Sequence, residues 1–134
     1  MLARGRAAEV ETYLNWCAAQ GLTVVRVLTM AENLFALEPE HGRAALPRLL
    51  TMAAERGLYV EIVALADTGA IRLDIDEHVR EVGAIAGRHP NALVELANEP
   101  GHHTQAERID DTSELAKLAS LVPEPVPDRG RLYP

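Results

Sequence analysis

The chain has 134 residues, a length that fits one domain with a single hydrophobic core. Its composition, 48% hydrophobic and 25% charged, indicates neither disorder nor a collagen-like fibre. The net charge is −7, and the 13 basic residues form no dense run, which argues against a nucleic-acid partner.

The sequence shows no sign of export or membrane insertion. Its first residues lack the apolar stretch of a secretory signal, and no segment approaches the roughly 20 apolar residues of a membrane span. We therefore expect a cytoplasmic chain, as written, with no membrane partner. The single cysteine, Cys17, cannot form an internal disulfide and is expected to pack in the core.

Three segments are predicted to form strands, at residues 23–28, 59–66 and 92–97. Gly21 and Gly57 come shortly before the first two, where a left-handed glycine closes the preceding helix. The β-branched residues that follow suit strands buried on both faces. Pro90 is expected to stop the helix before the third strand.

The spacing of these strands indicates the fold class. The strand regions start at Leu22, Leu58 and Ala92, close to 35 residues apart. A repeating helix–strand unit of this length predicts parallel βα architecture.

Apolar spacing of three and four residues predicts helices between the strands and after them. The apolar stripes are Val10, Leu14 and Cys17, then Leu46, Leu49, Leu50 and Ala53, then Val79, Val82 and Ile85, and last Leu115 and Leu118. Asp74 and Asp111 each stand three residues before a Glu and are expected to cap the last two helices. Residues 31–42 are expected to be a long loop. Three prolines in five positions from Pro123 onward predict an irregular tail over residues 122–134, after a domain of residues 1–121.

The tripeptide Asn98-Glu99-Pro100 is the strongest indication of function. It follows the strand 92–97, and the carboxyl ends of parallel strands are where chemistry gathers in α/β folds. Glu95, Ala97 and Glu99 share one parity, so strand alternation would aim Glu99 toward the interior of a barrel. An acidic residue before proline is also common in turns.

The segment Leu93-Val94-Glu95-Leu96-Ala97-Asn98-Glu99-Pro100 resembles the fourth strand of the clan A glycoside hydrolases, the cellulase- and mannanase-like (β/α)₈ barrels. The resemblance implies that Glu99 is the general acid/base of a retaining mechanism and that Asn98 contacts the sugar 2-hydroxyl. It extends from about Ala7 to about Leu121. The resemblance thus implies a partial (β/α)₈ TIM barrel that forms the catalytic domain, residues 1–121. This part would hold about three parallel strands, corresponding to strands two to four of the full barrel, with their flanking helices.

The run Val24-Val25-Arg26-Val27 is similar to the second strand of those enzymes, whose Arg orients and charges the nucleophile. Arg26 also attracts attention without the family, because a guanidinium in an apolar strand is costly unless it meets a carboxylate. The alternative is an arginine at the strand end that reaches solvent while its stem packs. Asp67 departs from the family pattern, which often places a His near the end of the third strand. We expect Asp67 to belong to a loop.

A retaining glycosidase needs two carboxyl groups about 5 Å apart, an acid/base and a nucleophile. The sequence matches only the first, since the family's nucleophile ends strand seven and none of the remaining acids fits that motif. We therefore expect little or no activity from the isolated chain. The sugar, the linkage and a secreted parent enzyme all stay open.

The resemblance also suggests a carbohydrate partner and no cofactor. His102 and His103 would follow strand four and line the sugar cleft, and Phe35 would offer a stacking surface for a sugar ring. Exposed loop histidines and a phenylalanine that covers the barrel rim are the structural alternatives. A metal site at the histidines lacks a third ligand at a familiar spacing.

Two other classes of function remain open. The first is a non-catalytic α/β binding or interaction domain, which would self-associate through the open edges of its sheet. The second is the product of a truncated or frame-shifted gene, suggested by the abrupt change to Pro-rich sequence after Val122.

Overall fold

The computed structural model describes residues 2–29, 39–70 and 72–123. Within these ranges three parallel strands form one open sheet in the order β1-β2-β3; they are β1 (Val24–Leu28), β2 (Tyr59–Leu65) and β3 (Ala92–Ala97). The helices are α1 (Ala7–Ala19), α2 (Pro39–Ala54), α3 (Ile75–Ala86) and α4 (Thr112–Ala119), with short 3₁₀ turns η1 (Leu2–Arg4), η3 (Thr68–Ala70) and η4 (Glu107–Asp110). The predicted parallel α/β class is confirmed.

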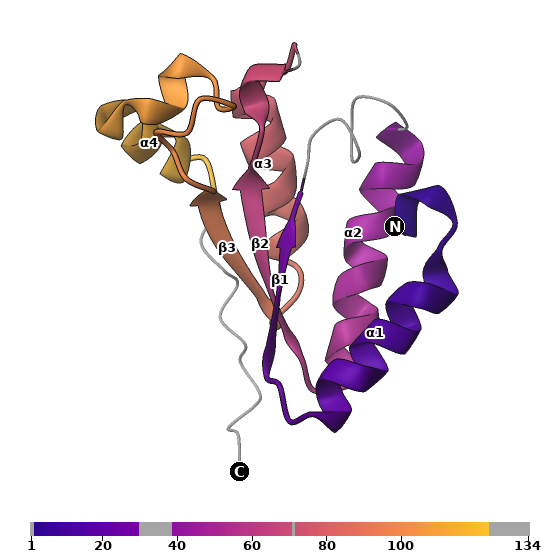
Figure 1. Ribbon diagram of the computed structural model, residues 1–134. Helices are drawn as coiled ribbons and strands as arrows, with labels where there is room; N and C mark the ends of the chain where they lie inside the picture. Colours follow the sequence, from indigo (N-terminus) through magenta and orange to yellow (C-terminus); the bar gives the residue numbers. More distant parts are fainter. Residues whose placement is uncertain (1, 30–38, 71, 124–134) are drawn as a thin grey trace.

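One face of the sheet is covered by helices. Figure 1 shows α1, α2 and α3 on the same side of the strands. The strand residues that point to this side share a single hydrophobic core with the helices; they include Val25, Val60, Ile62 and Ala64, packed with Leu14, Leu50, Val79 and Leu118. Because alternate strand residues point to opposite faces, the remaining strand residues line the other face.

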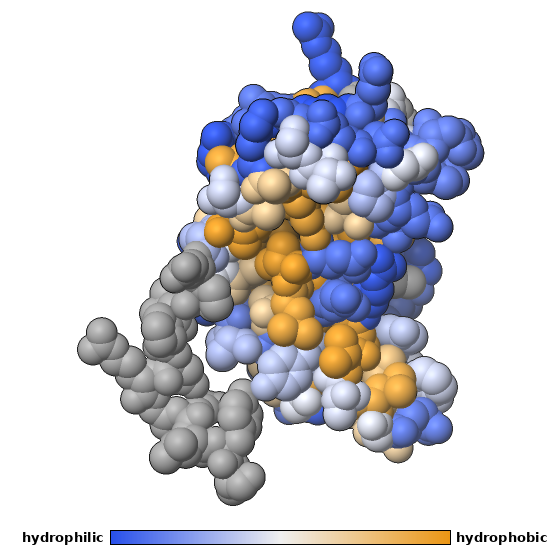
Figure 2. All heavy atoms as spheres, turned by 90° about the vertical axis from the view of Figure 1, so that its left-hand side faces the viewer, coloured by the Kyte–Doolittle hydropathy of each residue, from blue (hydrophilic) through white to orange (hydrophobic). Residues whose placement is uncertain are grey.

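The opposite face is open over much of the described structure. Val24, Leu28 and Leu93 lie on it and are 42%, 47% and 47% exposed. Figure 2, which views the molecule from the left-hand side of Figure 1, shows apolar surface running down the molecule with a hydrophilic area beside it. On the central strand of the same face Val63 is fully buried, so these three exposed apolar side chains lie on the flanking strands.

Local signals set most of the element boundaries. Gly21 and Gly57 have φ of +73° and +69°, as predicted for residues that close helices α1 and α2. Asp74 caps α3, since its Oδ1 accepts a hydrogen bond from the amide of Glu77 at 3.0 Å. Asp111 caps α4 in the same way. These predictions are confirmed.

Two predicted boundaries were wrong. Helix α3 ends at Ala86 with Gly87 as its cap, so it stops before it reaches Pro90. The amide of Gly87 still donates to Gly83 O at 2.8 Å, and Pro90 instead belongs to the turn that leads into β3. Helix α2 begins at Pro39, so residues 39–42 are helical and not part of a loop. Proline is well suited to the first position of a helix, where its missing amide has no partner to lose.

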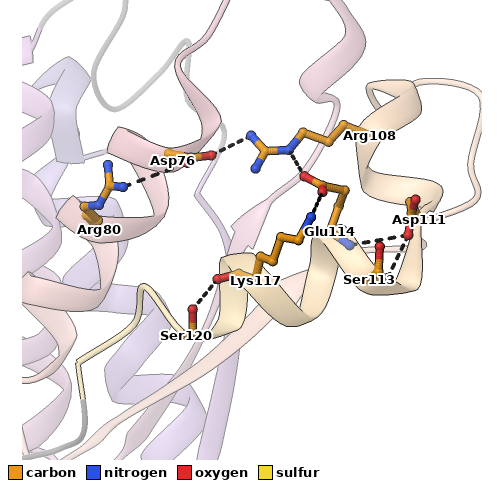
Figure 3. A network of polar contacts seen from close by, with 8 residues as sticks. All are labelled: Asp76, Arg80, Arg108, Asp111, Ser113, Glu114, Lys117 and Ser120. Carbon is orange, nitrogen blue, oxygen red and sulfur yellow. Dashed lines mark hydrogen bonds and ion pairs between the residues drawn. The ribbon is translucent and has the colours of Figure 1, made fainter.

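An ionic network attaches α4 to α3 (Figure 3). Arg108 of η4 donates to Asp76 at 2.5 Å and to Glu114 at 2.7 Å, and Lys117 contacts the second oxygen of Glu114 at 2.5 Å. The hydrogen bonds from Lys117 and then Arg108 lower the pKa of Glu114. Beneath the network, Leu118 is fully buried in the core.

The end of the described chain packs on α3. Val122 lies against the hydrophobic core, and a Cβ at Gly83 would stand only 2.9 Å from Pro123 Cδ. The remainder of the expected irregular tail, residues 124–134, lies outside the described residues. No helix in the described ranges is both long and apolar enough to cross a membrane.

Candidate functional site

The carboxyl ends of the three strands meet at one edge of the sheet (Figure 1). Thr29 follows β1, Asp67 comes shortly after β2, and Asn98 follows β3. Thr29 is buried, and its hydroxyl donates to the carbonyl of Val63 at 2.6 Å, which ties the end of β1 to β2. Backbone pairing also extends past β3, because the amide of Asn98 donates to Leu65 O at 2.9 Å.

Arg26 joins the two outer strands across the open face. Its Nε and Nη2 atoms each donate to one carboxylate oxygen of Glu95 at 2.9 Å, in a bidentate pair. Glu61, on the strand between them, has an oxygen 3.8 Å from Arg26 Nε. Arg26 therefore meets carboxylates, as its place in an apolar strand required, although its side chain is also 42% exposed.

Arg26 also fixes the orientation of Asn98. Its Nη2 atom donates to Asn98 Oδ1 at 3.2 Å. A guanidinium only donates hydrogen bonds, so the oxygen of the Asn98 amide must face it and the NH₂ group must point elsewhere. That NH₂ group donates to Glu99 Oε2 at 3.3 Å. The structure thus brings Arg26, Asn98 and Glu99, the three residues assigned to catalysis by the resemblance, into one chain of contacts.

Glu99 does not continue the strand. Strand β3 ends at Ala97, and Glu99 has φ of +43°, so the alternation expected to aim its side chain does not reach it. Asp67, shortly after β2, has φ of +52°. These are the two non-glycine residues with positive φ in the described ranges, and both are exposed acids at the same edge of the sheet. Such conformations cost free energy and gather at functional sites.

Gln105 holds the two loops together, a role that the sequence did not reveal. Its Oε1 accepts hydrogen bonds from the hydroxyl and the amide of Thr68 at 2.7 and 3.2 Å. Its Nε2 donates to the carbonyl of Asn98 at 2.5 Å and to that of Leu65 at 3.3 Å. This buried amide therefore fixes the backbone beside Glu99 relative to the end of β2. Thr68 and Leu65 lie 37 and 40 positions from it in sequence, so no local pattern marks it.

The histidines predicted to line a sugar cleft lie on the same loop. Both are exposed, and their ring centroids are 4.2 Å apart. The amide of His102 donates to Glu99 O at 2.9 Å, which places His102 one turn after the candidate acid. Phe35, the predicted stacking residue, lies outside the described residues.

The described residues hold no group of three or more His, Cys, Asp or Glu side chains arranged to bind a metal ion. The described surface also has a cleft on the helix side, lined by residues of α2, of α3 and of the segment just before α3, among them Arg43, Asp74 and Glu81. Its lining includes none of Arg26, Asn98 and Glu99.

Comparison of the chain with protein family models, with curated proteins and with solved structures gives no significant match.

Proposed function

We propose that this chain forms part of a retaining glycoside hydrolase of the (β/α)₈ type, in which it supplies strands two to four and the acid/base Glu99. The observation that carries the proposal is the contact chain from Arg26 through Asn98 to Glu99. Arg26 lies in β1, and Asn98 and Glu99 follow the end of β3. Arg26 and Asn98 stand 72 positions apart in the chain. Their proximity is the arrangement that the family resemblance requires of its Arg, Asn and Glu.

The topology of the sheet supports the same proposal. The strand order follows the chain order, and the core between sheet and helices lies on one face. In a doubly wound sheet the strand order reverses and helices cover both faces, whereas a barrel keeps the order and places all helices outside. The open face, with Arg26, Glu61 and Glu95, then corresponds to a barrel interior.

In this mechanism Glu99 donates a proton to the leaving oxygen and then activates water for the second step. The Asn98 amide, oriented by Arg26, presents its NH₂ group beside Glu99 as a hydrogen-bond donor. In the family the corresponding arginine directs its positive charge at the nucleophile. In this chain Arg26 pairs with Glu95, so the Glu95 carboxylate neutralises that positive charge. The second carboxylate must come from a unit equivalent to strand seven, and the isolated chain is expected to show little or no hydrolysis.

Oligosaccharide binding tests the proposal without turnover. Cello-, manno- and xylo-oligosaccharides would be titrated into the ¹⁵N-labelled chain and followed by NMR. We expect shifts at Arg26, Asn98 and Glu99, and loss of binding in Asn98→Ala. The matched control is Glu55→Gln, at the opposite end of the sheet, which should bind normally. A panel in which no sugar shifts these resonances contradicts the proposal.

Catalysis requires a barrel completed by units that supply the second carboxylate. In such a reconstituted enzyme, Glu99→Gln should abolish hydrolysis of unactivated oligosaccharides, because their sugar leaving group needs a proton that the amide cannot donate. Normal rates in that variant would refute the role of Glu99.

The exposed apolar side chains favour a second candidate, an interaction domain. Val24, Leu28 and Leu93 give the open face an apolar surface of the kind that marks contact with another protein. Sedimentation of the chain distinguishes the two: concentration-dependent association that is lost on Leu28→Lys, without sugar binding, would favour this candidate.

A further inference from the structure

A hydrogen-bonded relay connects the loop after β2 to the loop after β3. The hydroxyl of Thr104 lies 2.6 Å from Asp67 Oδ1. The Nδ1 atom of His102 lies 2.9 Å from the same hydroxyl oxygen. The three side chains thus form a line from the acid, through the hydroxyl, to the imidazole.

The chemistry of these groups assigns the protons. A carboxylate only accepts, so the single hydroxyl proton of Thr104 is donated to Asp67. The hydroxyl oxygen can then only accept from His102, which places a proton on Nδ1. The Thr104 amide nitrogen also lies 3.4 Å from Nδ1, and a hydrogen bond donated by this amide would require Nδ1 to be unprotonated. The contact between Nδ1 and the hydroxyl oxygen, at 2.9 Å, is shorter than the contact between Nδ1 and the amide nitrogen, at 3.4 Å. The contact with the hydroxyl is therefore the stronger hydrogen bond.

We propose that Asp67 and Thr104 hold His102 in its Nδ1–H tautomer, so that Nε2 accepts a hydrogen bond from a hydroxyl group of a bound sugar. The choice of tautomer by a partner of the opposite ring nitrogen is general for histidine. The sugar as ligand rests on the proposed function, whereas the tautomer rests on the relay alone. Asp67 and Thr104 are positioning residues, and His102 is the binding residue.

The backbone around the relay keeps it in place. The amide of Gly69 donates to Thr104 O at 2.9 Å, and a Cβ at Gly69 would stand 2.9 Å from that oxygen, so the two loops meet closely. Gln105, next to Thr104, bonds both loops. The ring of His103 lies tilted against that of His102, with an angle of 41° between the ring planes. His102 is thereby placed one turn after Glu99, on the edge of the sheet where the sugar is expected.

The first measurement is the tautomer of His102, read from the ¹⁵N shifts of the imidazole nitrogens at a pH where the ring is neutral. We expect Nδ1 to be protonated in the wild type and in Thr104→Ser, which keeps the hydroxyl. In Thr104→Val and Asp67→Asn the Nδ1–H tautomer should lose its preference. His103, assigned with His103→Gln, is the internal reference and should not change. A wild-type His102 with protonated Nε2, or a tautomer unaffected by Thr104→Val, overturns the inference.

The second measurement is affinity for the oligosaccharides of the titration above. Thr104→Val should weaken binding about five- to tenfold, the loss of one hydrogen bond, while Thr104→Ser should bind as the wild type does. Unchanged affinity in Thr104→Val, with the tautomer altered, overturns the role of His102 and leaves the proposed function standing. Absence of sugar binding to the wild type, with the tautomer as expected, overturns the proposed function and the sugar as ligand of His102.

Discussion

The helix-covered face and the open face of the sheet come from alternate residues of the same three strands, yet they hold different kinds of side chain. The covered face is apolar, with Val60 and Ile62 fully buried. The open face combines the Arg26–Glu95 pair with partly exposed apolar side chains such as Leu93. Burial of the covered face stabilises the fold, whereas the polar groups of the open face orient Asn98 beside Glu99. The covered face is therefore expected to set stability, and the open face to set chemistry.

Ile62 and Leu93 are apolar side chains of the two faces, and their contributions to stability are expected to differ by several kcal/mol, about the cost of a core cavity. Ile62→Ala should lower the free energy of unfolding by about 2–5 kcal/mol, because it leaves a cavity in the core. Leu93→Ala should change it by at most about 0.5 kcal/mol, because Leu93 is 47% exposed. Urea unfolding of both variants gives the two values. A cost for Leu93→Ala as large as that for Ile62→Ala would mean that the open face is covered in solution.

A buried histidine adds a pH dependence to the covered face. The Nε2 atom of His78, in α3, lies 2.6 Å from Ala64 O. Burial lowers the pKa of His78, although hydrogen bonds to the backbone act in the opposite direction. The unfolded chain therefore takes up a proton near pH 6.5, while the folded chain does so only at lower pH. Since the unfolded state then binds more protons, stability is full above about pH 6.5 and falls as the pH drops toward the folded pKa.

Unfolding measured between about pH 8 and pH 5 checks this window. His78→Gln should flatten the dependence, at a cost in stability at high pH. Burial also lowers the pKa of His89, so His89→Gln is the control that separates the two histidines. Carboxylates with a lowered pKa, such as Glu114, stabilise the fold fully above their ordinary pKa of 4.5. They lose this contribution to stability only below that pH, outside this pH window. An unchanged profile in His78→Gln would contradict the assignment.

Two arginines with similar ion pairs, one on the open face and one away from it, are each expected to contribute little to stability. Arg26 on the open face and Arg108 beside α4 each contact two carboxylates and are 42% and 37% exposed. Arg26→Gln and Arg108→Gln should each cost less than about 1 kcal/mol, and less still at high salt. Only Arg26→Gln should shift the side-chain amide resonances of Asn98. A shift of those resonances in Arg108→Gln as well would remove the distinction between an arginine that positions the site and one that joins helices.

The elements of the fold were predictable because their signals are local. The β-branched runs, the apolar stripes and the caps at Asp74 and Asp111 each depend on neighbours within about four residues. The same logic failed at Pro90 and Pro39, where one residue type permits three outcomes. Proline can end a helix, stand in a turn after one or begin one, and local sequence does not choose among these.

The parallel α/β class, the positions of the strands and the place of Asn98 and Glu99 at a strand end follow from patterns in the sequence. No such pattern indicates that Arg26 pairs with Glu95 and orients Asn98, that Gln105 bonds both loops, or that Asp67 reaches Thr104. Arg26 and Asn98 stand 72 positions apart in the chain. Gln105 and Thr68, like Thr104 and Asp67, stand 37 positions apart. Helix and strand formation depends on near neighbours, whereas these contacts exist only once the strands have aligned and brought their ends together.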